Sequence, residues 1–305
     1  MTAPLATAAE MQQAIVRHHG AAYADFPAQS LPAPACDEPV YLAALAACST
    51  LGFIAHDADC LARAWAAQTL RLGRFDAARW PDEPQDFGLQ PRPHAQPFAP
   101  CPQALGLYAV LPDAAWVGRM ARTGVPTVQL RYKSDDADAI AREVRAAVAA
   151  VQGTNALLFI NDHWRDAIAA GAYGAHLGQE DLDALTPNEL NELRASGLRL
   201  GVSTHGYAEM LRADAASPSY IAMGAVFPTT LKKMATVPQG VARLAAYARL
   251  MRGYPQVAIG GIGLEQFGQV RATGVGSIAV VRALVNAEQP EAAAAQLMQA
   301  MRTGV

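Results

Sequence analysis

The sequence predicts an α/β fold: a (β/α)8 barrel of the TIM type that follows an N-terminal, mainly helical extension. The first observation behind this prediction is that short, almost wholly apolar runs recur about every 25 residues after residue 104. The second is that segments rich in Ala, Leu, Glu and Arg, with helical periodicity, separate these runs. The third is that polar residues directly follow the apolar runs, as they do where the strands of a barrel end.

Length and composition narrow the possible classes of protein. The chain has 305 residues, of which 52% are hydrophobic and 17% are charged, and its formal net charge is -3. This length fits two average domains or one large barrel with an attached segment, and the apolar fraction excludes wholesale disorder. A mildly acidic chain lacks the basic surface that nucleic-acid binding requires, so we expect no nucleic-acid partner. Without a membrane-spanning apolar run or a secretory signal, we expect a cytoplasmic protein that binds no membrane.

The first 80 residues are predicted to form the helical extension. Tyr41–Leu51 and Asp57–Leu72 have the pattern of two amphipathic helices, and Gly52 breaks the chain between them. All cysteines lie in the first third of the chain, at Cys36, Cys48, Cys60 and Cys101. Because they form no Cys-x-x-Cys pair, we expect reduced thiols and no zinc site.

A proline-rich stretch separates this extension from the rest of the chain, with seven prolines between Trp80 and Gln103. Because proline fixes φ and lacks an amide hydrogen, we expect neither regular helix nor central strand there. The predicted organisation is therefore a helical extension over residues 1–80, an extended linker over residues 81–103 and a barrel over residues 104–305.

Eight apolar runs follow the linker, and their unbroken hydrophobicity predicts parallel strands that are buried on both faces. The runs are Leu105–Leu111, Thr127–Leu130, Ala156–Ile160, Gly174–Leu177, Leu198–Val202, Tyr220–Met223, Gln256–Ile259 and Ser277–Val281. The clearest helical patterns between them are Asp135–Val151, Thr186–Ala195, Val241–Met251 and Leu264–Ala272. Thr186 and Pro187 have the residue types of an N-cap and a first helical position. Eight strands that alternate with helices in about 200 residues predict a closed barrel rather than an open sheet.

Charged residues at the strand ends indicate chemistry with phosphates. Asp162 and Asp181 follow adjacent strands, so we expect their carboxylates to converge on a hard cation such as Mg²⁺. The only lysines of the chain follow strands, at Lys133, Lys232 and Lys233. A cation flanked by Arg131, Lys133 and Lys232 would bind a diphosphate and stabilise it as a leaving group.

Other strand ends add to this site. Gln129 shares its parity with Arg131 and Lys133, so all three side chains are expected to point towards the barrel axis. The Gly260-Gly261 pair after the seventh strand predicts a second site, for a monophosphate. Taken singly, a Gly-Gly pair is commonly a turn, Asn161-Asp162 is commonly a helix N-cap, and His176 and His205 are commonly structural. The joint placement of these residues on successive strand ends favours a functional site rather than these separate structural roles.

These residues stand in blocks that resemble thiamine phosphate synthase, a family that joins a pyrimidine diphosphate to a thiazole phosphate. The resemblance runs from about Leu105 to Arg302, with the blocks in the order of the family. The most specific blocks are Gln-Leu-Arg-Tyr-Lys at 129–133, Phe-Ile-Asn-Asp at 159–162, Ala-His-Leu-Gly-Gln-Glu-Asp at 175–181, Gly-Val-Ser-Thr-His at 201–205 and the Phe-Pro-Thr segment that begins at 227 and ends in Lys232. The resemblance implies a magnesium-dependent transferase of thiamine biosynthesis.

The resemblance also implies a role for each matching residue. Its catalytic residues would be Arg131, Lys133, Ser203 and Lys232, with Ser203 near the pyrimidine. Gln129 and Asn161 would contact the pyrimidine diphosphate, and Asp162 and Asp181 would bind magnesium. The thiazole phosphate would be held by Thr229, Thr230, Gly260, Gly261 and the backbone of Val281 and Arg282. Two positions depart from the family pattern, because Leu231 stands where a threonine is usual and Arg282 where a serine is usual.

The mechanism implied by the resemblance is dissociative: diphosphate leaves first, and the thiazole nitrogen then attacks the pyrimidine cation without a protein nucleophile. Two alternatives remain open from the residues. One is a thiazole tautomerase on the same barrel, with a histidine near His205, and the other is a non-catalytic protein that binds thiamine precursors. Residues 40–75 faintly resemble the C-terminal helices of hydroxymethylpyrimidine phosphate kinase, which predicts a degenerate kinase fragment or a helical cap. The sequence leaves a homo-oligomer open.

Overall fold

The computed structural model describes residues 7–229 and 237–303. The chain forms two compact units: one comprises Met1–Arg92 with Gly206–Arg212, and the other comprises Pro93–His205 with Ala213–Val305. The division at Arg92 falls within the proline-rich stretch. Among the described residues, no helix combines the length and the apolarity that crossing a membrane requires.

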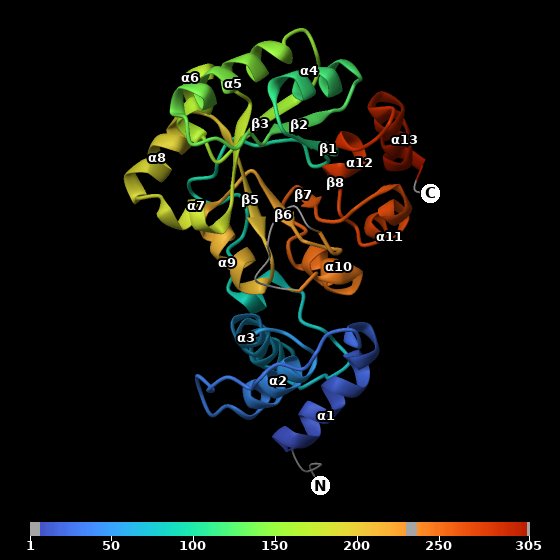
Figure 1. Ribbon diagram of the computed structural model, residues 1–305. Helices are drawn as coiled ribbons and strands as arrows, with labels where there is room; N and C mark the ends of the chain where they lie inside the picture. The colour runs from blue at the N-terminus through green and yellow to red at the C-terminus, as the bar shows by residue number, and fades with distance from the viewer. Residues whose placement is uncertain (1–6, 230–236, 304–305) are drawn as a thin grey trace. The chain divides into compact units, whose positions relative to one another are not determined.

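The second unit is a closed barrel of parallel strands in which each strand pairs with its neighbours in chain order and β8 pairs with β1 (Figure 1). The strands are β1 Gly106–Leu111, β2 Thr127–Leu130, β3 Leu157–Asn161, β4 Gly174–Leu177, β5 Arg199–Thr204, β6 Tyr220–Met223, β7 Gln256–Ala258 and β8 Ser277–Val280. The predicted (β/α)8 barrel is confirmed. Strand β5 extends two residues beyond its predicted end, because Ser203 and Thr204 continue the ladder opposite Ala222 and Met223.

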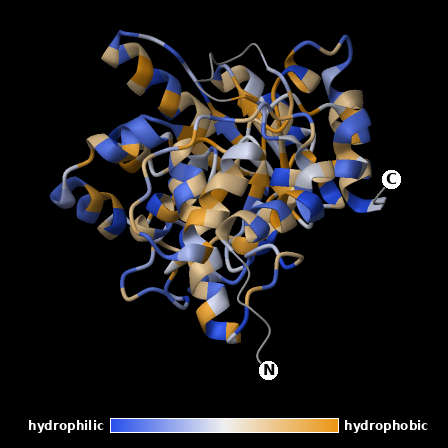
Figure 2. Ribbon diagram, turned by 90° about the horizontal axis from the view of Figure 1, so that it is seen from below, coloured by the Kyte–Doolittle hydropathy of each residue, from blue (hydrophilic) through white to orange (hydrophobic). Residues whose placement is uncertain are grey.

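Helices follow the strands and surround the barrel (Figure 1). They are α4 Ala114–Arg122, α5 Ala137–Ala150, α6 Trp164–Ala170, α7 Gln179–Ala184, α8 Pro187–Ala195, α9 Tyr207–Ala216, α10 Gly240–Leu250, α11 Phe267–Arg271, α12 Arg282–Val285 and α13 Pro290–Thr303. Hydrophilic and hydrophobic residues alternate along the outer helices (Figure 2). The helix predicted over Leu264–Ala272 is interrupted: a 3-10 turn, η3 Leu264–Gln266, precedes α11.

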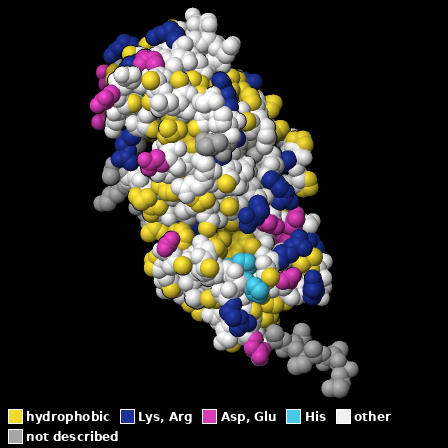
Figure 3. All heavy atoms as spheres, turned by 90° about the vertical axis from the view of Figure 1, so that its right-hand side faces the viewer, with side chains coloured by type: hydrophobic (Ala, Val, Ile, Leu, Met, Phe, Trp, Pro, Cys, Tyr) yellow, Lys and Arg dark blue, Asp and Glu magenta, His cyan; other side chains and the backbone are white. Residues whose placement is uncertain are grey.

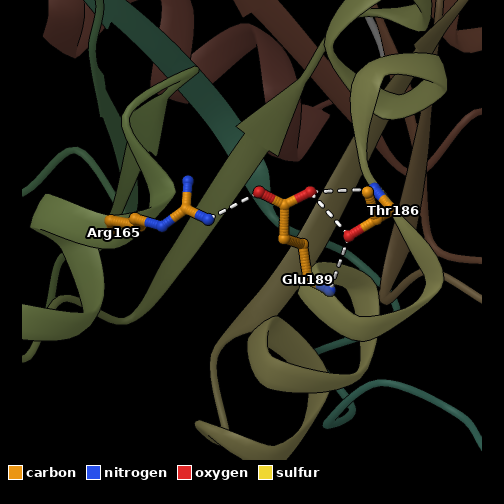
Figure 4. Close-up of polar contacts among 3 residues, drawn as sticks. All are labelled: Arg165, Thr186 and Glu189. Carbon is orange, nitrogen blue, oxygen red and sulfur yellow. Dashed lines mark hydrogen bonds and ion pairs between the residues drawn. The ribbon is translucent and has the colours of Figure 1, made fainter.

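Helix α8 begins as the sequence predicts, with Thr186 as N-cap and Pro187 in the first turn. The Thr186 side chain accepts a hydrogen bond from the Glu189 amide, and the Glu189 carboxylate accepts from the Thr186 amide and hydroxyl. The same carboxylate accepts from Arg165 Nη2 on α6 at 2.6 Å (Figure 4). These donors, Arg165 foremost, lower the pKa of Glu189 to about 2. Glu189 therefore caps α8 and ties it to α6.

The interior of the barrel is filled by large side chains from several strands. Tyr108, Phe159 and Tyr220 are almost fully buried and pack edge to face or tilted, with ring centroids 5.1–5.9 Å apart. Glycine makes room for them: a Cβ at Gly174 would lie 2.5 Å from the Phe159 ring, and one at Gly201 would lie 2.1 Å from Tyr220 Cζ. Close packing of this kind leaves no space for an added methyl group.

The first unit contains α1 Ala8–His19, η1 Gly20–Tyr23, α2 Pro39–Thr50, α3 Ala55–Leu72 and η2 Pro84–Phe87. The two predicted helices are present. Helix α2 is buried on most of its surface rather than amphipathic, because eight of its twelve residues are buried. Helix α1, which the sequence interpretation missed, buries only Met11 and Ile15 and begins with a capping box of Thr7 and Glu10.

The proline-rich stretch is largely irregular, as predicted, apart from the 3-10 turn η2, where Pro84 occupies the first turn. Within this turn Asp86 is buried and pairs with both Arg71 Nε (2.8 Å) and Arg71 Nη2 (2.5 Å).

On the face shown in Figure 3, Lys and Arg side chains are scattered among acidic and uncharged residues.

Residues 206–212, which contain the start of α9, pack within the first unit. Asp57 Oδ1 accepts a hydrogen bond from the Ala208 amide at 2.9 Å, and Trp80 Nε1 donates to the Tyr207 hydroxyl at 3.0 Å. A Cβ at Gly206 would lie 2.1 Å from Asp57 Oδ2, so only glycine fits there. The helical extension therefore holds the first turn of α9, directly after His205 in the chain.

Candidate active site

Two of the predicted pyrimidine-contacting residues meet at the carboxyl ends of β2 and β3. Gln129 is buried, and its Nε2 donates a hydrogen bond to Asn161 Oδ1 at 3.1 Å. The pairing follows from the register, in which Gln129 stands opposite Phe159, two residues before Asn161. The amide nitrogen of Arg131 continues the ladder by donating to the Leu111 carbonyl, and its side chain is half-buried.

A cation and a carboxylate meet beside this pair. Lys133 Nζ lies 2.7 Å from Asp162 Oδ2, with side chains that are 58% and 23% exposed. Asp162 has a φ of 65°, in the left-handed region that few residues other than glycine adopt. Its amide still donates to the His176 carbonyl, so the strained residue stays anchored to β4 while the backbone leaves the ladder. Residues held in sparsely populated backbone conformations cluster at functional sites.

Asp181, in the first turn of α7, completes an acidic pair with Asp162. Burial raises the pKa of Asp181 above its usual value, and the negative charge of Asp162 and a hydrogen bond with it raise that pKa further. A hydrogen bond from the Gly178 amide and the positive charge of Lys133 lower the pKa of Asp181 and so partly offset this rise. The structure thus brings together the two predicted magnesium ligands and one of the predicted diphosphate-binding cations.

Ser203, on β5, lies at one end of a line of hydrogen bonds. His176 Nε2 is 2.8 Å from Ser203 Oγ, and His176 Nδ1 is 2.7 Å from the Tyr220 hydroxyl. The Tyr220 hydroxyl is in turn 2.7 Å from that of Tyr108. The sequence interpretation assigned no role in the site to His176 and missed both tyrosines. Their signal was a tyrosine inside an otherwise apolar strand, because a buried phenol needs a hydrogen-bond partner.

The described residues of the predicted thiazole-phosphate site follow β6, β7 and β8 in the chain. Gly260 and Gly261 have φ values of 104° and 67°, and an added Cβ would lie 2.5 Å from Ala225 or 2.6 Å from the Pro228 carbonyl oxygen. This turn therefore requires glycine at both positions. Thr229 is half-buried, whereas Val281 and Arg282 mark the start of α12. Thr230, Leu231, Lys232 and Lys233 lie outside the described residues.

The barrel of this chain is similar to known proteins. The family model described as thiamine monophosphate synthase matches residues 107–284. The chain is 54% identical over 195 residues to thiamine-phosphate synthase of Neisseria meningitidis serogroup B, which covers 64% of this chain and 94% of the relative. It is 50% identical over 207 residues to thiamine-phosphate synthase of Salmonella dublin, which covers 68% of this chain and 97% of the relative.

A solved structure is similar as well. Thiamine phosphate pyrophosphorylase from Pyrococcus furiosus superposes with a TM-score of 0.58 at 27% identity. This match covers 66% of the chain and 97% of that structure. About two thirds of this chain matches almost the whole length of each of these relatives. The remaining third of the chain has no counterpart in them.

Proposed function

The chain belongs to the thiamine-phosphate synthase family, and from that premise we propose that it joins 4-amino-2-methyl-5-hydroxymethylpyrimidine diphosphate to 4-methyl-5-(2-phosphoethyl)thiazole. The products of this reaction are thiamine phosphate and diphosphate. The observation that carries the proposal is the cluster of Lys133, Asp162 and Asp181 beside the Gln129–Asn161 pair. These groups stand at the carboxyl ends of successive strands, where a barrel places its reacting atoms.

The arrangement suits departure of an anionic group rather than covalent catalysis. The bond between the pyrimidine methylene carbon and the diphosphate oxygen breaks, and its electron pair leaves with the diphosphate. We expect Lys133, which pairs with Asp162, and the half-buried Arg131 to stabilise the negative charge that develops on that group. The amino-substituted ring delocalises the positive charge of the carbon. The thiazole nitrogen then supplies the electron pair of the new carbon–nitrogen bond.

The acidic pair fits a divalent cation by its own chemistry. The negative charge of Asp162 raises the pKa of Asp181, so the two carboxylates repel one another. A cation bound between them would remove that repulsion. No group of three or more His, Cys, Asp or Glu residues with metal-binding geometry occurs in the described ranges. Two carboxylates with phosphate oxygens and water are the usual protein setting of Mg²⁺. When bound by Asp162 and Asp181, Mg²⁺ would supply charge neutralisation to the leaving diphosphate.

The proposed site of the thiazole phosphate is on the same rim of the barrel, at the carboxyl ends of β6, β7 and β8. Gly260 and Gly261 both have positive φ values in the turn after β7, and we expect the backbone amides of this turn to bind the phosphate. Thr229 and the backbone of Val281 and Arg282 come from the neighbouring strand ends. Thr230 and the lysine at 232 are part of the proposal from the resemblance alone.

The full-length protein, incubated with both substrates and Mg²⁺, tests the proposal by assay of thiamine phosphate and diphosphate. We expect Asp162→Asn to lower turnover by at least about 100-fold, because it removes half of the negative charge that holds the cation. The matched control is Glu180→Gln, which removes an exposed carboxylate next to Asp181 on α7 and should retain wild-type turnover. Absence of product at saturating substrates, or normal turnover of Asp162→Asn, would refute the proposal. A tautomerase would release no diphosphate, and a binding protein would form no product.

A further inference from the structure

Four polar side chains form a continuous line through the barrel, from its core to the proposed site. Tyr108 on β1 and Tyr220 on β6 are 2% and 0% exposed, and His176 on β4 is 8% exposed. The three successive separations, from Tyr108 through Tyr220 and His176 to Ser203, are 2.7, 2.7 and 2.8 Å. The direction of these hydrogen bonds decides what Ser203 presents to a substrate.

Tyr108 stands at the closed end of the line and sets that direction. Within the described part of the chain its hydroxyl contacts one hydrogen-bonding group, the Tyr220 hydroxyl. If Tyr220 were the donor, the buried Tyr108 hydrogen would have no acceptor, which is unfavourable in an apolar core. Burial raises the pKa of both phenols, so both keep their hydrogens at neutral pH. Tyr108 therefore donates to Tyr220.

The remaining bonds follow from this first one. Since the Tyr220 oxygen accepts from Tyr108, its own hydrogen goes to His176 Nδ1. An imidazole that accepts at Nδ1 is neutral and carries its hydrogen on Nε2. His176 Nε2 then donates to Ser203 Oγ. The hydroxyl hydrogen of Ser203 is left for an acceptor outside this line.

Ser203 is also held through its backbone. Gln179 Nε2, at the start of α7, donates to the Ser203 carbonyl at 2.7 Å. The side chain and the main chain of this residue are thus each held by a hydrogen bond from the β4 side of the barrel. A serine fixed in this way presents its hydrogen in one direction and loses little rotamer entropy on binding.

We propose that the Tyr108–Tyr220–His176 line is a positioning device, which holds His176 as the neutral Nε2–H tautomer and makes Ser203 a hydrogen-bond donor to a ring nitrogen of the pyrimidine substrate. The identity of that substrate rests on the proposed function. His176 is a positioning residue in this scheme, because it acts through Ser203 and transfers no proton to the reacting atoms.

The tautomer is measurable without any substrate. In the full-length protein labelled with 15N-histidine, we expect His176 to show a protonated Nε2 and an unprotonated Nδ1 at neutral pH, with the resonance identified by its loss in His176→Gln. Tyr108→Phe should preserve this pattern, because Tyr220 can still donate to Nδ1. Tyr220→Phe removes that donor and should perturb the His176 resonances. An Nδ1–H tautomer, or a doubly protonated His176, overturns the proposal.

Kinetics test whether His176 acts through Ser203. We expect His176→Leu to lower kcat/KM for the pyrimidine diphosphate by about 10–100-fold and to leave KM for the thiazole phosphate unchanged. His176→Gln, whose Nε2 can still donate to Ser203, should recover part of the loss. In a Ser203→Ala background, His176→Leu should have no further effect. A full additional loss in that background, or equal losses for both substrates, overturns the positioning role. If the protein forms no product at all, the proposed function fails and the tautomer measurement still decides this inference.

Discussion

Gly201→Ala should destabilise the barrel, because the β5 ladder places Gly201 directly opposite Tyr220. An added Cβ would lie 2.1 Å from Tyr220 Cζ and 2.4 Å from its hydroxyl oxygen, whereas ordinary contact begins near 3.4 Å. The ring must therefore move by about 1.3 Å, the difference between 3.4 and 2.1 Å. That displacement breaks the hydrogen bonds of Tyr220 to Tyr108 and His176.

The expected loss of stability has two parts. Overpacking a well-packed core typically costs about 1–3 kcal/mol. Each of the two hydrogen bonds contributes about 0.5–1.5 kcal/mol. The free energy of unfolding should therefore fall by about 2–6 kcal/mol. At the lower limit this corresponds to a Tm lower by roughly 4–8 °C in thermal unfolding followed by circular dichroism.

Two controls separate this clash from a general effect of the methyl group. Gly268→Ala, in α11, adds the same methyl where nothing lies within 4 Å, so it should leave Tm unchanged or raise it slightly. In a Tyr220→Ala background the ring is absent, and Gly201→Ala should then cost far less than in the wild type. Wild-type stability of Gly201→Ala, or an equal loss in both backgrounds, would refute the packing argument.

Two further predictions concern other parts of the chain. Glu189→Gln should lower Tm at neutral pH, because the lowered pKa of Glu189 means that its charged form stabilises the fold. This stabilisation is complete above the usual pKa of 4.5 and is lost as the pH falls towards 2, so the Tm difference between variant and wild type should shrink over that window; a constant difference would contradict it. Burial raises the pKa of Cys60 to about 12, so native alkylation at pH 8, followed by mass spectrometry, should modify the exposed Cys36 well before Cys60; equal rates would contradict the burial of Cys60.

The strands of the barrel were predictable because their signal is local. Strands buried on both faces are largely apolar, and Thr127–Leu130, Gly174–Leu177 and Tyr220–Met223 have the bounds that the sequence predicts. The end of β5 was misplaced because Ser203 and Thr204 are polar, and only their pairing with β6 extends the strand. Helix α1 was missed for a related reason, since two buried residues give too weak a periodic pattern.

The sequence likewise identified some residues of the candidate site but not the contacts between them. Lys133, Asp162 and Asp181 were recognisable because each follows a strand, and parallel strands of a barrel end on one rim. The 2.7 Å separation of Lys133 Nζ from Asp162 Oδ2 and the left-handed conformation of Asp162 are properties of the folded chain that no pattern in the sequence predicts. The packing of residues 206–212 within the first unit was equally hidden, because the contact of Asp57 with Ala208 joins segments that are 151 residues apart.

By itself, the sequence determined the architecture, the family and the types of residue that stand at the strand ends, because hydrophobic periodicity and chain order are written along the chain. Only the tertiary structure decided how those residues work together. Closure of the barrel brings β1, β4, β5 and β6 around one axis, so the hydroxyl of Tyr108 reaches Tyr220, and through it His176 and Ser203. Hydrogen-bond direction depends on which buried groups meet, and that is a property of packing in three dimensions.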